Sequence, residues 1–385
     1  MTRARVSGVL GVLALLCAGC STPYKMPVFE SRPAGHTEFS GIAQLVSQTP
    51  DRSIDVLIVH GMCTHDETWA RSSIAGLSKM LGGPDAPTVV PEPVTGTQTT
   101  LFRASISTTH GTVNASAIVW SPVVARLKSQ LCYDQTNKSA DCKSIVPDAP
   151  PYPYERASLN RALKDDLLND CLADALIYQG KSRDAISQQL QQALLAASTP
   201  NGAKLAKQSM LSAASTASKP IVFISESLGS KVAFDAIYKL QNSADDAERL
   251  AGVRVFDRFA QVFMGANQLP ILALADQDIG GGTKARSVSD YPVDPLGALL
   301  GMRKSSPSTM APRPLQVVAF TDPNDLLSYA LARSTSVMSF DVVDAIVSND
   351  NTLFGFVERP DTAHTAYRKN DVVTKLIACG TKGCP

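Results

Sequence analysis

The stretch KPIVFISESLGSK, residues 219–231, decides the fold prediction for this chain. Residues 221–224 form a continuous apolar run typical of a buried strand, and a helical pattern follows over 231–240. Between them, Ser227 has a small residue two positions before it, Ser225, and another two positions after it, Gly229. A sharp strand-to-helix turn needs such neighbours, because larger side chains would clash where the chain reverses. The stretch therefore predicts a strand, a turn that lifts the Ser227 hydroxyl above a sheet, and a helix. The alternative is a Ser/Gly turn that only caps the helix.

Similar apolar runs, rich in β-branched residues, recur along the chain. They predict buried strands at 55–60, 115–120, 259–264, 315–320 and 340–347. Helical patterns lie between them, over 163–178, 186–196 and 231–240. Strands that alternate with helices predict an α/β fold with a mostly parallel central sheet.

Two long spans interrupt this alternation. Residues 122–220 are too many for one crossover, so we expect a helical insertion there. Residues 280–314 open with three glycines, carry several prolines and are predicted as a long loop. Long connections on a rigid sheet are often functional, and both spans are expected to form the walls of a pocket.

The charge balance excludes one class of partner. The chain has 36 basic and 35 acidic residues and a net charge of +1, so it has no electrostatic footprint for nucleic acid. Hydrophobic residues make up 44% of the chain, which is enough for a sizeable core.

A second candidate site segment, Val59-His60-Gly61-Met62, ends the first clear strand. A tetrahedral intermediate needs two backbone N–H donors aimed at its oxyanion. One is expected from the residue after the nucleophile, Leu228, and the other from the loop after an earlier strand, at Met62. His60 is interpreted as a structural residue that shapes this loop.

Together these segments resemble the α/β-hydrolase superfamily over roughly residues 50 to 380. Ser225 replaces the first glycine of the usual G-x-S-x-G pattern but is also small. The resemblance implies an α/β-hydrolase fold, with helices on both faces of the sheet, and a triad in the chain order Ser, acid, His. His364 is the only histidine after Ser227, so elimination selects it as the general base.

The acid of the triad should follow the strand at 315–320, where two carboxylates compete. The resemblance favours Asp325, which lies a few residues beyond the strand and before apolar residues. Asp322 is better placed to cap the turn, and Asp361 is a remote third choice.

The resemblance implies a serine hydrolase that cleaves ester-type acyl bonds through an acyl-enzyme, without cofactor or metal. Its substrate would be a small-molecule or lipid ester. Alternatives on the same triad are an acyltransferase or a peptidase. A non-catalytic surface-binding lipoprotein on a hydrolase scaffold is a further alternative.

Residues 1–19 are predicted to be a signal peptide. Two arginines precede an almost wholly apolar segment at 6–18, which is too short to span a bilayer. The segment ends in Ala18-Gly19-Cys20, which resembles a bacterial lipobox, although Cys17 stands where that pattern prefers leucine. The resemblance implies acylation of Cys20; the alternative is an ordinary signal peptide without lipid.

This reading also predicts the location and the layout of the chain. Ser21 after Cys20 favours, by resemblance, the outer membrane of the cell envelope. Residues 20–38 are rich in Pro, Ser and Gly and are predicted to be a lipidated tether. Residues 39–385 would form the hydrolase domain.

Six further cysteines agree with export, because an even number in an oxidising compartment suggests disulfides. Fifteen pairings are open. Short loops favour Cys132–Cys142 and Cys379–Cys384, which leaves Cys63–Cys171. The chain has no Cys-x-x-Cys, so a zinc site is not expected.

Overall fold

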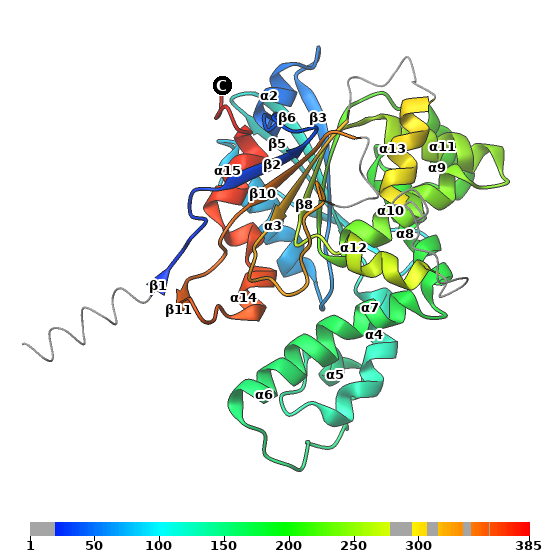
Figure 1. Ribbon diagram of the computed structural model, residues 1–385. Helices are drawn as coiled ribbons and strands as arrows, with labels where there is room; N and C mark the ends of the chain where they lie inside the picture. The colour runs from blue at the N-terminus through cyan, green and yellow to red at the C-terminus, as the bar shows by residue number, and fades with distance from the viewer. Residues whose placement is uncertain (1–19, 278–294, 306–314, 334–339, 354) are drawn as a thin grey trace, which may run out of the picture.

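A nine-stranded mixed sheet is the centre of the protein (Figure 1). The computed structural model describes residues 20–277, 295–305, 315–333, 340–353 and 355–385. The strand order is β2-β10-β9-β8-β7-β3-β6-β5-β4; the strands from β10 to β6 are parallel, and β2, β5 and β4 pair antiparallel. The strands are β2 Val28–Arg32, β3 Ser53–Val59, β4 Val90–Pro93, β5 Thr100–Thr108, β6 Gly111–Val119, β7 Ile221–Glu226, β8 Phe259–Gly265, β9 Gln316–Thr321 and β10 Val342–Ile346. The predicted α/β class and mostly parallel sheet are therefore confirmed.

Helices cover both faces of this sheet (Figure 1). Along β3, Leu57 and Val59 pack in one apolar core and Val56 and Ile58 in the other, as the alternation of a strand requires. The first core contains α8 Arg183–Ala197, α9 Lys207–Thr216, α10 Leu228–Gln241, α11 Asp246–Asp257 and α13 Pro295–Ser305. The second contains α2 Ile42–Ser47, α3 Glu67–Met80 and α15 Asp371–Cys379.

A helical lobe projects from one end of the sheet, within the span predicted as an insertion (Figure 1). Its helices are α4 Pro122–Lys128, α5 Ala140–Ile145, α6 Ser158–Ala162 and α7 Ala173–Gln179, with a 3₁₀ turn at Ser129–Asp134 and a π-helix at Leu163–Leu172. The rest of the span, α8 and α9, packs on the sheet instead.

The segment 20–38 is not the free tether that its composition predicts. β2 joins the main sheet antiparallel to β10, and β1 Cys20–Ser21 pairs with β11 Thr352–Leu353. The physical reason is that the outer edge of β10 offers a row of unpaired backbone groups, which β2 satisfies.

The predicted loop at 280–314 also needs correction, because α13 occupies Pro295–Ser305. Leu296, Leu299 and Leu300 are buried in the core, and an apolar face of this kind is stable as a helix. Residues 280–294 and 306–314 lie outside the described residues.

Within the described ranges, no helix is long and apolar enough to cross a membrane.

Three disulfides confirm the predicted pairing: Cys63–Cys171, Cys132–Cys142 and Cys379–Cys384. Cys132–Cys142 lies within the lobe. Cys63–Cys171 joins the loop after β3 to the lobe, and Cys379–Cys384 holds the chain that follows α15.

Candidate active site

Ser227 stands at the turn between β7 and α10, as predicted, with φ 52° and ψ −128°. Positive φ is uncommon for a residue with a side chain and occurs where surrounding contacts enforce it. The Ser227 amide donates to the Gly265 carbonyl at 2.8 Å, which holds the turn against β8. A Cβ added to Gly229 would lie 2.4 Å from the His60 carbonyl oxygen. The turn therefore requires the small residue that the sequence has there.

Ser225 occupies the position where the usual pattern has glycine. Its side chain is fully buried, and its Oγ lies 2.8 Å from the Oγ of Ser230. A buried hydroxyl needs such a partner, so the substitution is accommodated by a second serine one turn into α10.

His364 lies within hydrogen-bonding distance of Ser227. It lies in α14 Pro360–Thr365, and its Nε2 is 3.0 Å from Ser227 Oγ. Its Nδ1 is 2.9 Å from Oδ1 and 3.1 Å from Oδ2 of Asp325. All three side chains are buried. The structure thus brings together a hydroxyl, an imidazole and a carboxylate in one hydrogen-bonded chain.

Asp325, rather than the other two carboxylates, reaches the imidazole. Asp322 accepts from the Asn324 amide at 2.9 Å and from the Asn349 amide at 2.5 Å, so it caps the turn as expected. Asp361 is half exposed and pairs with Arg359 at 2.5 Å.

Tyr367 belongs to this site and was missed by sequence reasoning. Its hydroxyl donates to Asp325 Oδ2 at 3.0 Å and accepts from the Asp322 amide at 2.8 Å. Burial, together with the nearby Asp325 charge, raises the pKa of Tyr367 well above its ordinary value, so the phenol keeps its proton. The signal in the sequence that could have identified Tyr367 is its position only three residues after the predicted base, His364.

Of the two residues expected to supply oxyanion donors, Leu228 directly follows Ser227, and Met62 directly follows a residue that contacts it. Leu228 is the first residue of α10, so its amide has no acceptor within the helix. Met62 follows Gly61, and a Cβ added to Gly61 would lie 2.6 Å from the Ser227 Cβ. The backbone after β3 therefore passes directly against the serine.

His60 shapes this loop. Its Nδ1–H donates to the Gly61 carbonyl at 2.9 Å, and its Nε2 accepts from the Trp120 amide at 3.0 Å. The Trp120 indole N–H returns a bond to the His60 carbonyl at 3.0 Å. Burial lowers the pKa of His60 well below its ordinary value, so the ring stays neutral and keeps both bonds.

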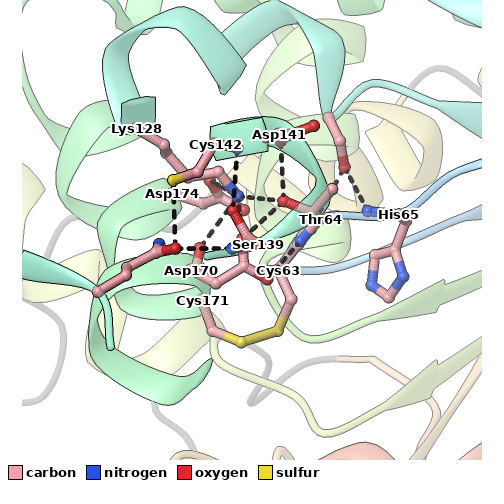
Figure 2. A network of polar contacts seen from close by, with 12 residues as sticks. Cys63, Thr64, His65, Lys128, Ser139, Asp141, Cys142, Asp170, Cys171 and Asp174 are labelled. Atoms are coloured by element: carbon pink, nitrogen blue, oxygen red, sulfur yellow. Dashed lines mark hydrogen bonds and ion pairs between the residues drawn. A yellow bond between two sulfur atoms is a disulfide. The ribbon is translucent and has the colours of Figure 1, made fainter. Parts of the chain in front are cut away.

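A polar network ties the same loop to the lobe (Figure 2). Asp170 accepts from the Thr64 amide at 2.9 Å and from the Thr64 hydroxyl at 2.6 Å. Lys128 lies 2.7 Å from Asp170 and 3.1 Å from Asp174, beside the Cys63–Cys171 disulfide. Burial raises the pKa of Asp174 to about 7 although Lys128 opposes the shift. The residues that follow Met62 are therefore held in place by contacts with the lobe.

Potential metal ligands lie together at one place in the described part of the chain. The one grouping of potential ligands there is Cys63, Asp170 and Cys171, and both sulfurs belong to the disulfide.

An apolar cavity of about 180 Å³ lies between α3 and α15. Its lining includes Glu226 and Tyr367 but neither Ser227 nor His364. Glu226 pairs with Arg368 at 2.8 Å, and burial nevertheless raises the pKa of Glu226.

The chain matches no protein-family model, no curated protein and no solved structure.

Proposed function

We propose that this protein is a serine hydrolase of the α/β-hydrolase type that cleaves ester-type acyl bonds. The observation that carries the proposal is the 3.0 Å contact of Ser227 Oγ with His364 Nε2, whose Nδ1 in turn contacts Asp325. Serine, aspartate and histidine follow β7, β9 and β10 in that chain order, which is the order of this superfamily.

The geometry supports a two-step mechanism. His364 donates Nδ1–H to Asp325, so Nε2 carries the lone pair that accepts the Ser227 proton as Oγ attacks the acyl carbon. The amides of Met62 and Leu228 stabilise the oxyanion, and Asp325 stabilises the imidazolium. His364 then protonates the leaving alkoxide. In the second step it deprotonates a water molecule that hydrolyses the acyl-enzyme.

We also propose that Cys20 is acylated and that the protein is held at the outer membrane of the cell envelope. The three disulfides support export, because disulfides persist in oxidising compartments.

A fluorophosphonate probe tests the nucleophile. We expect the wild-type protein to be labelled and to hydrolyse short p-nitrophenyl esters, and Ser227→Ala to do neither while unfolding at an unchanged temperature. Ser225→Ala is the matched control, because it removes a hydroxyl two residues away that faces Ser230 instead. If Ser227→Ala is still labelled, the nucleophile is a residue other than Ser227. Labelling without ester turnover would favour acyl transfer or peptide cleavage, and no labelling would favour a non-catalytic lipoprotein.

A further inference from the structure

The turn after β11 presents apolar side chains to solvent. Phe356 is 92% exposed, Val357 55% and Leu353 50%. Two backbone hydrogen bonds connect these residues: the Leu353 amide donates to the Val357 carbonyl at 2.8 Å, and the Phe356 amide donates to the Leu353 carbonyl at 3.0 Å. We call these three residues the β11 turn. Exposed apolar side chains that lie this close together are typical of a contact surface.

The N-terminal segment meets the protein at this turn. Cys20 is the register partner of Leu353, and Ser21 of Thr352, with their hydroxyls 2.7 Å apart. The Tyr24 amide then donates to the Ser348 hydroxyl at 3.0 Å, before β2 enters the sheet. The chain between Cys20 and the sheet is thus bound to the rest of the protein at several points. It does not act as a flexible linker between Cys20 and the folded domain.

We propose that the β11 turn is a membrane-contact surface that enters the lipid interface beside Cys20. The proposal rests on the lipid anchor proposed above but not on the hydrolase activity. Acyl chains on Cys20 would place the bilayer surface beside Leu353, which is the register partner of Cys20. Apolar side chains that lie at this depth lose water by entering the interface, which favours insertion.

The surface also lies near the candidate active site. β1, β11 and α14 share one end of the molecule in Figure 1. Glu358, the residue after the turn, accepts from the Asn324 side chain at 2.7 Å, next to Asp325. A membrane contact at the turn would therefore hold α14, with His364, close to the lipid surface.

A tryptophan reporter tests this contact. The two native tryptophans, Trp69 and Trp120, are 5% and 0% exposed. The mature protein carrying Phe356→Trp is incorporated into vesicles of phosphatidylethanolamine and phosphatidylglycerol, with or without brominated acyl chains. We expect a blue shift of the added emission and its loss with brominated lipid. Leu250→Trp, at a 52% exposed position on α11, is the matched control and should keep its emission.

Equal quenching at both positions, or none at position 356, would overturn the proposal and would leave a protein partner as the occupant of the turn. The experiment is independent of catalysis, because Ser227→Ala added to Phe356→Trp should leave the quenching unchanged. Phe356→Ser should hydrolyse a soluble ester at the wild-type rate.

Discussion

Asp325 is distinguished from Asp322 only by what each carboxylate accepts. Asp325 receives the His364 imidazole, the Tyr367 hydroxyl and the Leu327 amide, whereas Asp322 receives two backbone amides. Both carboxylates are buried, and each has the hydrogen-bond donors that a buried polar group requires. One carboxylate orients the candidate base, and the other holds the turn that carries the first.

Asp325→Asn should lower kcat by about 10⁴-fold, because the amide no longer fixes the tautomer in which His364 Nε2 can accept a proton. Asp322→Asn should lower kcat much less than Asp325→Asn does, and its main effect should be a lower free energy of unfolding. Steady-state hydrolysis of a p-nitrophenyl ester and urea unfolding measure the two effects. The opposite ranking in kcat would assign the acid to Asp322.

Tyr367→Phe should reduce kcat by about tenfold, because Asp325 loses a donor that positions it. It should also cost about 1–3 kcal/mol of stability, because the Asp322 amide is left buried without its acceptor. Tyr329→Phe is the control. Tyr329 is half exposed and lies in the loop that carries Asp325, and its replacement should change neither kcat nor stability much. A wild-type kcat in Tyr367→Phe would show that the hydroxyl has no positioning role.

At the scale of elements, the β7–α10 turn is built by close approach of two backbones. α10 begins so near the end of β3 that only hydrogen fits at Gly229. The strand, the turn and the helix are each local features, but their contact with the His60 carbonyl is not. The turn conformation of Ser227 therefore depends on a segment far away in the sequence.

Gly229→Ala should destabilise the protein by about 1–3 kcal/mol, because the new methyl group must displace the His60 carbonyl. It should also reduce fluorophosphonate labelling, since Ser227 shifts with the turn. Gly76→Ala in α3 is the matched control: nothing lies within 4 Å of its added Cβ, and alanine in a helix should stabilise by roughly 1 kcal/mol. Urea unfolding of both variants measures the difference. Similar behaviour of the two would contradict the packing argument.

At the scale of the molecule, the lobe is joined to the sheet where the candidate oxyanion loop lies. The Cys63–Cys171 disulfide closes a span of 108 residues, and Cys63 directly follows Met62. A crosslink over a long span restricts the unfolded chain strongly. The same bond also limits how far the Met62 amide can move relative to Leu228.

Replacing Cys63 and Cys171 together by serine should cost about 2–5 kcal/mol of stability. It should also lower kcat, because the candidate oxyanion loop is less restrained. Replacing Cys379 and Cys384, which are separated by only 5 residues, is the control and should leave kcat unchanged. Thermal unfolding and ester hydrolysis provide the measurements. Equal loss of kcat in both double variants would indicate a general effect of instability.

Local patterns in the sequence were sufficient for the features that depend on neighbouring residues. The apolar runs predicted six strands of the sheet, because burial on both faces requires continuous apolar residues. The spacing of small residues around Ser227 predicted the turn, and short loops predicted two disulfides, with the third left by elimination. β4 was missed because it is a short, mostly exposed edge strand with two prolines. β5 was missed because polar residues interrupt its buried apolar ones. β2 was missed within a Pro- and Gly-rich segment.

Only the tertiary structure decided which distant groups meet. Asp325 and Asp322 are three residues apart and chemically equal in the sequence, yet the direction of one turn brings Asp325 alone to His364. Tyr367 acquires its contacts because α14 returns it to the loop after β9. β2 joins the sheet because β10 has an open edge, which is a property of the folded sheet and not of residues 28–32. Sequence patterns report local conformation, whereas these contacts depend on the path of the whole chain.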